Sequence, residues 1–428
     1  METELSNAAE ETVPSGYKRT EVGVIPEDWT VTIVGSVASV KTGPFGSALH
    51  EKDYIDEGIP IITVEHLGDR GILHGEIPQV SESDYRRLSN YRLAEGDIVF
   101  SRVGSVDRNA HVNTSESGWL FSGRLLRVRI QSAQVSPKFL SFHFHTEAFK
   151  QRVRDVAVGQ TMASINTKIL SGILAVIPSS TKEQQLIAAA LSDADALIES
   201  LEQLIAKKRL VKQGTMQELL TGKRRLPGFS GSFTSTTLGA CLVSMPDYGI
   251  NAPACPFSED LPRYLRITDI SEFGGFQTAD PVSVDSVESD KYYLQEGDLV
   301  FARTGASVGK SYLYDKTDGP LVFAGFLIRV RPDPQLLDSG FLSAVVTTNR
   351  YWTWVSMMSM RSGQPGINGV EYSQLPLSLP TTQEQSAIAR ILSDMDAELD
   401  ALEARLAKAR QVKQGMMQQL LTGKIRLV

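Results

Sequence analysis

The segment Gly-Ala-Ser-Val-Gly-Lys-Ser at 305–311 is the stretch of this chain that comes nearest to a site for chemistry, a phosphate-binding P-loop. A Walker A loop has four residues between its glycines, whereas three separate Gly305 from Gly309, and Thr304 stands where a glycine should be. The residues that follow favour a strand and turn, not the helix whose N-terminus would hold phosphate. The matching stretch of the first half, 104–108, has no Gly-Lys pair. We expect no nucleotide site here, and a P-loop ATPase stays as one alternative function.

Metal and nucleophile chemistry has little support in the sequence. His143 and His145 stand two residues apart, a spacing that can ligate a metal, but no cysteine pair lies near them. The two cysteines, Cys241 and Cys255, form neither a disulfide framework nor a four-ligand zinc pattern. We therefore expect packing or surface roles for the histidines. The chain is predicted to be no enzyme, with no metal and no cofactor of its own.

An internal repeat organises the whole chain. Residues 183–223 and 384–424 share about 25 of 41 positions without a gap, at an offset of 201 residues. Earlier segments repeat in the same order at nearly the same offset: 93–102 with 294–303, and 121–129 with 323–331. Ordered matches at one offset exclude chance, so the chain is a duplication of one unit.

The most similar segments of the repeat predict two long helices. Each begins with the spacing of a capping box, Ser180 with Glu183 and Thr381 with Glu384, and each ends near a Thr-Gly pair. Apolar residues follow at an average spacing of about 3.5 residues, which is typical of coiled coils. The stripe consists of Ile187, Leu191, Ile198, Leu201 and Ile205, and of Ile388, Leu392, Leu399, Leu402 and Leu406. We expect helices of ~60 Å that pack as an antiparallel coiled coil about a pseudo-two-fold axis.

The stretches outside the helices predict domains with many short strands. Strand-like segments at 58–64, 97–102 and 125–130 lie between clusters of Gly, Pro, Asn and Asp, and a short helix is expected over 137–154. The predicted fold class is α/β (mixed), with two pseudo-repeated α/β domains joined by two long helices. The segments are an acidic flexible tail (1–20), a first domain (21–178), the first helix (179–226), a second domain (227–379) and the second helix (380–428).

The two parts of each repeat have diverged to different extents. The positions that the two helices share include some off the apolar stripe, as in Lys-Gln-Gly at 212–214 and 413–415. The domains, in contrast, differ in their loops. Identical helix surfaces suggest that the chain binds two copies of one partner, or that the two helices form one intramolecular seam. Divergent loops suggest that the two domains bind different ligands. The alternative explanation for the loops is neutral drift. Glycine inside a helix costs about 0.5–1 kcal/mol relative to alanine. We therefore expect another backbone to approach Gly214 and Gly415 closely.

Three motifs carry a family resemblance. They are the opening Tyr-Lys-Arg-Thr-Glu-Val-Gly-Val-Ile-Pro-Glu-Asp-Trp at 17–29, the Gly-Asp-(Ile/Leu)-Val-Phe-(Ser/Ala)-Arg strand of each half, and the Val-Lys-Gln-Gly…Leu-Leu-Thr-Gly-Lys helix ends. Together, and in this order, they resemble the specificity subunit of type I restriction–modification systems over nearly the whole chain. The resemblance implies two target-recognition domains, 21–178 and 227–379, each reading one part of a split, asymmetric DNA sequence. The helices would then set the spacer between the two parts.

The resemblance also implies partners. Such subunits have no catalytic site; they bind double-stranded DNA, dock two copies of a DNA adenine methyltransferase subunit, and through these recruit ATP-dependent restriction subunits. S-adenosylmethionine and ATP are then expected on the partner subunits only. No apolar run reaches the ~18–20 residues needed to span a bilayer, and the acidic N-terminus is unlike a signal peptide. We expect no membrane partner and a cytoplasmic location.

Residues that read bases are expected among polar side chains in loops beside the repeated strands. The candidates are Ser101, Arg102, Arg108, Asn109, Gln160, Thr161 and Asn166 in the first domain and Arg303, Lys310, Ser311, Arg361, Gln364 and Asn368 in the second. Arg102 and Arg303 are identical in both copies and fit a framework acid or a phosphate better than a base, whereas Arg108 and Lys310 differ and fit a base better. Trp352 and Trp354 could stack on an extruded base, but aromatic residues on a covering helix more often belong to the core.

The overall charge weighs against tight DNA binding by this chain alone. The formal net charge is −7, and phosphate binding favours basic surfaces. Basic residues nonetheless gather at the end of the first helix, at Lys207, Lys208, Arg209, Lys212, Lys223, Arg224 and Arg225. We therefore expect the partner subunits to supply much of the phosphate contact. An alternative of a different class is a coiled-coil scaffold that assembles protein partners without reading DNA.

Overall fold

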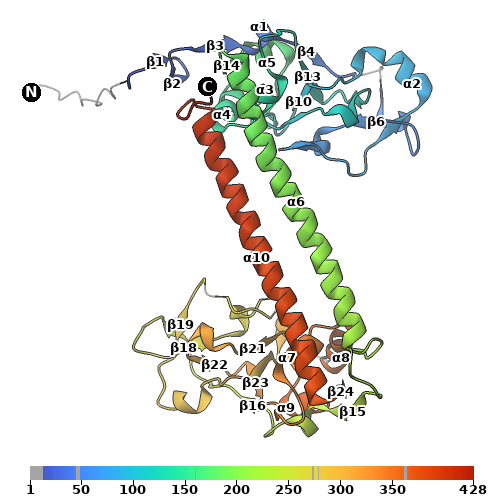
Figure 1. Cartoon of the computed structure of the whole chain (residues 1–428), viewed down its shortest axis with the longest axis vertical. Coiled ribbons are helices and arrows are strands. Elements are labelled where there is room, and N and C mark those ends of the chain that lie inside the picture. Colours follow the sequence, from blue (N-terminus) through green and yellow to red (C-terminus); the bar gives the residue numbers. More distant parts are fainter. Residues whose placement is uncertain (1–12, 45–48, 160, 272–273, 278, 361–363) are drawn as a thin grey trace, which may run out of the picture. The chain divides into compact units, whose positions relative to one another are not determined.

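The computed structural model describes residues 13–44, 49–159, 161–271, 274–277, 279–360 and 364–428. The chain divides into two units, Met1–Glu202 with Arg405–Val428, and Gln203–Ala404. Each unit contains one domain of mixed helices and short strands, together with parts of both long helices (Figure 1). The predicted α/β (mixed) fold with two long helices is confirmed.

The first unit is built on an antiparallel four-stranded sheet. Its strands are β4 (Ala38–Thr42), β10 (Ile98–Ser101), β11 (Asn109–His111) and β13 (Leu125–Ile130), in the order β11-β10-β13-β4. Strand alternation directs Leu126 and Val128 of β13 into the large core of the unit, and Leu125 into a smaller core on the other face. Arg127 and Arg129 therefore share the face of Leu125.

Shorter elements complete the first unit. The strands are β1 (Tyr17–Thr20), β2 (Gly23–Pro26), β3 (Trp29–Ile33), β5 (Tyr54–Ile55), β6 (Ile59–Ile62), β7 (Leu67–Gly68), β8 (Gly71–Ile72), β9 (Gln79–Val80), β12 (Leu120–Phe121) and β14 (Leu174–Pro178). The helices are α1 (Val34–Val37), α2 (Glu82–Arg87), α3 (Pro137–Phe144), α4 (Glu147–Asp155) and α5 (Thr167–Gly172). A second sheet has the order β12-β6-β9-β5, and β1 pairs with β2, β3 with β14, and β7 with β8. The predicted tail of 1–20 is wrong at its end, because Tyr17–Thr20 form a strand.

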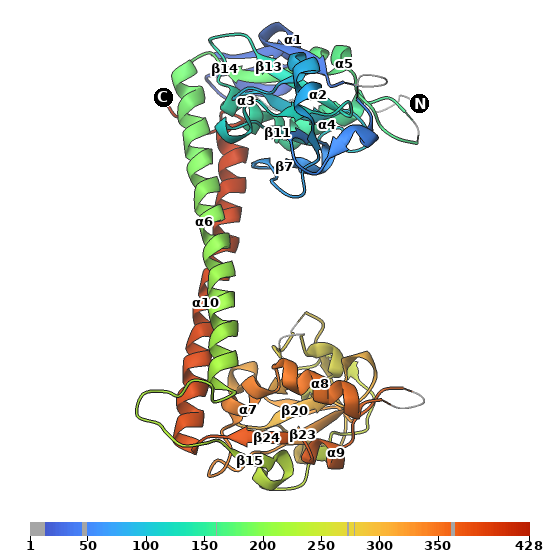
Figure 2. The same cartoon turned by 90° about the vertical axis from the view of Figure 1, so that its right-hand side faces the viewer.

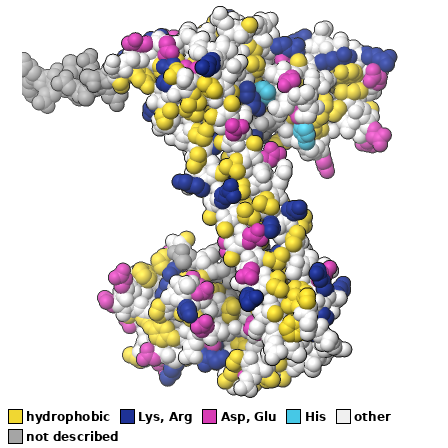
Figure 3. All heavy atoms as spheres, in the orientation of Figure 1, with side chains coloured by type: hydrophobic (Ala, Val, Ile, Leu, Met, Phe, Trp, Pro, Cys, Tyr) yellow, Lys and Arg dark blue, Asp and Glu magenta, His cyan; other side chains and the backbone are white. Residues whose placement is uncertain are grey.

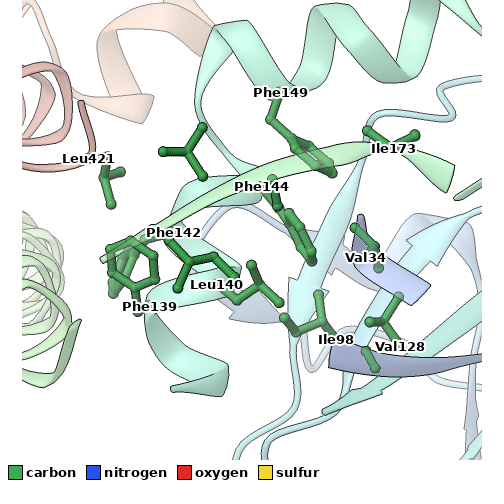
Figure 4. Packing of buried hydrophobic residues seen from close by; sticks show 14 of the residues in the cluster. Val34, Ile98, Val128, Phe139, Leu140, Phe142, Phe144, Phe149, Ile173 and Leu421 are labelled. Carbon is green, nitrogen blue, oxygen red and sulfur yellow. The ribbon is translucent and has the colours of Figure 1, made fainter. Parts of the chain in front are cut away.

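Aromatic residues of α3 and α4 fill the large core of the first unit. Phe139, Phe142, Phe144 and Phe149 pack there, with the rings of Phe144 and Phe149 4.4 Å apart, and Leu421 from the C-terminal segment joins the same cluster (Figure 4). Each buried side chain of this size stabilises the fold by about 1.5–3 kcal/mol. The single helix predicted over 137–154 is two helices, because the Thr146 hydroxyl accepts a hydrogen bond from the Phe149 amide and begins α4.

The second unit repeats the first. Its strands are β15 (Thr234–Thr237), β16 (Asp247–Tyr248), β17 (Cys255–Pro256), β18 (Arg263–Leu265), β19 (Val282–Ser283), β20 (Leu299–Ala302), β21 (Ser311–Leu313), β22 (Leu321–Phe323), β23 (Leu327–Val330) and β24 (Pro376–Leu379). Its short helices are α7 (Ser339–Val345), α8 (Asn349–Met358) and α9 (Gly369–Ser373). The main sheet, β21-β20-β23-β16, has the strand order of the first unit, and α7 and α8 pack against it (Figure 2). A second sheet has the order β17-β19-β18-β22.

The repeated segments form α6 (Thr181–Leu219) and α10 (Thr382–Leu420), each of 39 residues. Most of the predicted stripe is buried, from Ile187 to Ile205 in α6 and from Ile388 to Leu399 in α10, while Leu402 and Leu406 are half-buried. Neither helix, nor any other in the described part of the chain, is long and apolar enough to cross a membrane.

Ion pairs show that α6 and α10 run antiparallel within each unit. In the first unit Lys413 contacts Asp195 at 2.6 Å and Arg410 contacts Glu202 at 2.7 Å. The second unit has the corresponding pairs with the roles of the helices exchanged, Lys212 with Asp396 and Arg209 with Glu403. Residue numbers rise along one helix as they fall along the other, which confirms the predicted antiparallel packing.

The start of each long helix is bound to the residues that follow the end of the other. Glu183 is buried, and its carboxylate accepts hydrogen bonds from the Arg426 guanidinium at 2.6 and 2.8 Å and from Trp29 Nε1 at 3.3 Å. In the second unit the buried Glu384 accepts in the same way from Arg225. The predicted capping boxes are thus half formed: Ser180 caps the Glu183 amide, but the Glu183 carboxylate is used for the contact with Arg426.

Gly214 and Gly415 do not show the expected close approach within the chain. A Cβ added to either glycine would have no heavy atom within 4 Å among the described residues. The seam between the helices therefore does not require them. A contact with a partner stays as the explanation for these two positions.

Removing the Arg426 guanidinium should destabilise the first unit. The Arg426→Met variant leaves the Glu183 carboxylate buried with Trp29 as its remaining donor, and we expect a loss of about 2–3 kcal/mol in the free energy of unfolding. Urea titration of the full chain measures this loss. Lys424→Met removes an exposed charge of the same segment and is expected to change the stability by less than about 0.5 kcal/mol. Equal stability of the two variants would contradict a structural role for the pair.

Mild acid should destabilise the first unit before the second. Burial lowers the pKa of His111 and of His145 to about 4, and that of His143 to about 3, and the second unit has no histidine. Between pH ~6.5 and these values the unfolded chain binds protons that the folded unit does not. The free energy of unfolding therefore decreases as the pH is lowered, by up to ~1.4 kcal/mol per pH unit for each histidine.

Urea titrations at about pH 7 and about pH 5, with mass-spectrometric mapping of the unit that opens, measure this difference. The His143→Gln variant keeps an acceptor for the Val176 amide, which donates to His143 Nε2 at 3.2 Å, and should show a weaker pH dependence. Opening of the second unit first would show that the prediction is wrong.

Candidate nucleic-acid interface

The structure brings together the two loop segments predicted in each domain. In the first domain the chain after β10 pairs with the segment before α5: Gly104 donates its amide to the Ala163 carbonyl, and Ile165 donates to the Arg102 carbonyl. In the second domain Gly305 and Ile367 make the same bonds to Pro365 and Arg303. Each domain therefore presents one composite surface made of residues about 60 positions apart in the sequence.

Two of the predicted base contacts are internal. Ser101 is fully buried and donates its hydroxyl proton to the Val103 carbonyl, while Asn109 is buried and its Nδ2 lies 3.4 Å from the Phe144 carbonyl. Both lie in the strands β10 and β11, whose side chains in this region point into the domain. The expectation that these two side chains reach a base is therefore wrong for this conformation.

Asn166 and Asn368 are helix caps. Each side-chain oxygen accepts a backbone hydrogen bond of 2.9 Å, Asn166 from Ile169 at the start of α5 and Asn368 from Glu371 at the start of α9. Asparagine is a preferred N-cap residue because its side-chain oxygen accepts from the amide three residues on, and the sequence already contains it at both positions. These residues hold the second loop segment in place, and a DNA contact for them stays a prediction.

Arg102 and Arg303 are engaged within their own domains. Arg102 Nη1 lies 3.4 Å from the Gly123 carbonyl, and the Arg303 guanidinium lies over the Tyr248 ring, 4.9 Å from its centre. These contacts hold both side chains against their own domains, and a framework acid or a phosphate as their partner stays a prediction.

The remaining candidates lie at the surface of the composite loops. Arg108 is exposed and donates to the Leu67 carbonyl, Thr161 and Gln364 are exposed, and Lys310 and Ser311 are half-buried. Gln160 and Arg361 lie outside the described residues. Direct contacts of these seven residues with bases stay predictions.

The P-loop-like segment is a short turn followed by a strand. Gly305–Ser307 form a single 3-10 turn, and β21 begins at Ser311, so a strand and not a helix follows the loop. This confirms the predicted strand and removes the structural basis for a nucleotide site. Of the two tryptophans beside this loop, Trp354 is buried in the core, as predicted, while Trp352 is partly exposed on α8.

The sequence motifs did not predict a row of basic side chains on the first domain. We call Lys41, Arg127 and Arg129 the basic row; the Arg92 guanidinium lies instead over the Tyr85 ring, 3.9 Å from its centre. Arg127 and Arg129 lie on one face of β13, and Lys41 of β4 is the direct cross-strand neighbour of Arg127. The signal was the alternation Arg-Val-Arg in a strand otherwise apolar, but only the strand register shows that Lys41 joins it.

Backbone carbonyls of the turn at 89–92 hold the basic row. Lys41 Nζ donates to the Asn90 carbonyl at 3.0 Å, and both Arg127 Nη1 and Arg129 Nη2 donate to the Arg92 carbonyl, at 3.2 and 3.1 Å. Arg129 also makes two hydrogen bonds of 2.7 Å to the buried Asp97. Figure 3 shows Lys and Arg side chains gathered along the edge of the first unit where Figure 1 labels β4 and α2.

Groups that could hold a metal are absent from the described residues, since no cluster of three or more His, Cys, Asp or Glu side chains occurs there. His143 and His145 are instead buried in the first unit, where burial keeps their pKa values far below 6.5 and hence keeps the rings neutral at neutral pH. The packing role expected for this pair agrees with their positions.

The comparisons with known proteins agree with one another. The family description "Type I restriction modification DNA specificity domain" matches residues 26–207 and 274–411. A putative type I restriction enzyme MjaX specificity subunit of Methanocaldococcus jannaschii is 25% identical, with 96% of this chain and 97% of the relative covered. The StySPI specificity subunit of Salmonella potsdam is 22% identical, with 90% and 86% covered.

Solved structures share the fold. The type I restriction–modification S subunit from M. genitalium superposes with a TM-score of 0.61 at 15% identity, over 92% of this chain and 96% of that one. A chain from a structural study of type I complex assembly gives 0.51 at 14% identity, over 94% and 99%. Since the family description covers well over half of the chain, the protein belongs to the type I restriction–modification DNA specificity family, whose members are non-catalytic DNA-recognition subunits.

Proposed function

We propose that the chain reads a bipartite, asymmetric DNA target with one domain per half-site, and that it docks two copies of a DNA adenine methyltransferase subunit through the long helices. The target-recognition domains are assigned to 21–178 and 227–379. Through the methyltransferase subunits the complex would recruit ATP-dependent restriction subunits and act on DNA in the cytoplasm. S-adenosylmethionine and ATP would be bound by those partners.

One observation carries the DNA part of this proposal. The chain builds the same domain twice, with the same strand order and the same pairing between its two loop segments, yet the exposed residues of those loops differ. Arg108 in the first domain lies in the connection between β10 and β11. Lys310 in the second domain lies in the corresponding connection between β20 and β21. A shared framework with different polar loops is what two half-sites of different sequence require.

Two features of the long helices favour the docking of two identical partners. Lys212 and Lys413 are bound to Asp396 and Asp195, so the identity of these lysines has a reason inside the chain. Gly214 and Gly415 have none, because among the described residues nothing beyond their own helix turn lies within 4 Å of where a Cβ would stand. Open backbone at the same place on both helices suits one surface of a partner used twice.

Exchange of one domain tests the DNA part. Replacing residues 21–178 with the corresponding domain of another family member should move one half-site of adenine methylation and leave the other half-site and the spacer unchanged. Genome-wide mapping of methylated adenine reports both half-sites at once. The matched control is exchange of 227–379, which should move the other half-site. An unchanged target after both exchanges would favour the scaffold that assembles partners without reading DNA.

Alanine at the two helix glycines tests the docking part. The double variant Gly214→Ala, Gly415→Ala should stabilise the helices by about 1–2 kcal/mol in total, because the added methyl groups meet open space. We expect it at the same time to weaken assembly with the methyltransferase subunits about tenfold or more, measured by analytical ultracentrifugation. Ala194→Gly, a substitution on the same helix away from these sites, should lower stability without a comparable effect on assembly. Unchanged assembly in the double variant would remove the proposed contact.

A further inference from the structure

The basic row of the first domain has little compensating negative charge. Arg129 pairs with Asp97, but Lys41 and Arg127 form no ion pair within the described residues. The Nε atom of Arg127 is buried and has no hydrogen-bond partner. Three cations thus share one carboxylate, an arrangement that costs stability unless a further anion is bound.

The second domain shows what the same positions look like when the charges are balanced. Arg329 and Arg331 correspond to Arg127 and Arg129, and Asp247 takes the register position of Lys41 opposite the first arginine. Arg329 makes hydrogen bonds of 2.6 and 3.1 Å to the Asp247 carboxylate, and Arg331 pairs with Asp298.

A second substitution works in the same direction. Tyr293 stands in the second domain where the first has Arg92, and its carbonyl still accepts a hydrogen bond from the arginine of the strand, Arg329, at 3.0 Å. The position of Lys41 therefore holds an acid in the second domain, and the position of Arg92 holds a neutral side chain. The row carries a formal charge of about +2 when Asp97 is included, whereas its counterpart is neutral.

Like charges in the row disfavour one another. Burial, together with Arg127 and Arg129, lowers the pKa of Lys41, and burial together with Arg129 lowers that of Arg127. A bound anion would relieve both effects, because it favours the charged form of each group.

The row lies close to the composite loops. Lys41 and Arg127 face each other two residues along β13 from Leu125, which pairs with Ser101 at the end of β10, where the loop with Arg108 begins. Two residues of extended strand span about 6.8 Å, so the row lies directly beside this loop. Arg129 is 39% exposed at its side chain, so solvent reaches the row.

We propose that the basic row of Lys41, Arg127 and Arg129 binds one phosphate of the DNA backbone beside the half-site that the first domain reads, and that Asp247 abolishes this site in the second domain. The inference rests on the proposed DNA-reading function and adds a contact that is present in one domain and absent from the other. A phosphate oxygen would accept charge-assisted hydrogen bonds from the accessible donors of the row, Lys41 Nζ and the Arg129 guanidinium.

The salt dependence of DNA binding tests the site. We expect Lys41→Gln, in the assembled complex, to lower the slope of log affinity against log salt by about 0.9 and to weaken binding about fivefold near 0.15 M salt. The probe is a duplex that contains the methylation target, and a duplex without it should show a similar loss, since a phosphate contact carries no sequence information. Lys291→Gln, which removes an exposed lysine of the second domain, is the control and should change neither value.

Reciprocal exchange of the cross-strand residue separates binding from a structural role. Lys41→Asp should weaken DNA binding further yet raise the Tm of the first unit by about 2–4 °C, because it recreates the pair that Arg329 makes with Asp247. Asp247→Lys should lower the Tm of the second unit and increase the salt slope. A stabilising lysine of purely structural value would instead make Lys41→Asp lower the Tm.

These measurements distinguish failure of the phosphate site from failure of the proposed function. If the unmodified complex binds the methylation target no better than other DNA, the proposed function fails. If it binds with preference but Lys41→Gln leaves the salt slope unchanged, the phosphate site is overturned and the function stands. If inorganic phosphate raises the Tm of the unmodified protein but not of Lys41→Gln while the DNA slope is unchanged, the site takes a free anion and the proposal for DNA is likewise overturned.

Discussion

The buried contact between a glutamate at the start of one long helix and an arginine beyond the end of the other holds each unit together. Glu183 and Arg426 make it in the first unit, and Glu384 and Arg225 make it in the second. A carboxylate removed from water requires a partner of opposite charge with well-directed donors, and a guanidinium supplies two. The contact therefore determines which segments must meet: the start of α6 with the C-terminal segment, and the start of α10 with the segment after α6.

Packing around this contact follows from it. Gly423 adopts a positive φ, and a Cβ there would lie 2.3 Å from Pro26, so the chain turns closely under the first domain. Leu420 and Leu421 then enter the core that contains Phe139 and Phe149. In the second unit Leu219 and Leu220 enter the corresponding core beside Phe341. Each domain thus uses the end of a helix that begins in the other unit, which explains why the helix ends tolerate so little change between the copies.

Much of this architecture could be predicted from the sequence, because the duplication repeats local signals. The apolar stripe of α6 predicted its buried face, and Leu125–Ile130 was expected as a strand at its observed bounds. The site was harder to predict. Ser101 and Asn109 are polar residues beside loops, and only their tertiary contacts show that they point inward. The partner of Glu183 lies 243 residues away, so local capping rules could not find it.

The duplication also explains how one chain with an overall charge of −7 can bind DNA at a defined place. Net charge acts over the whole molecule and is screened by salt within about 8–10 Å, whereas a phosphate contact is decided by the charges within a few ångströms. In the second domain Asp247 neutralises Arg329, which stabilises the fold and offers nothing to an anion. In the first domain the same position is Lys41, so like charges face each other there, and a bound anion would stabilise them. The two domains therefore differ in how they trade stability for binding on one framework. The excess of acidic residues elsewhere on the chain makes DNA binding at local basic sites more selective, because it repels DNA from the rest of the surface.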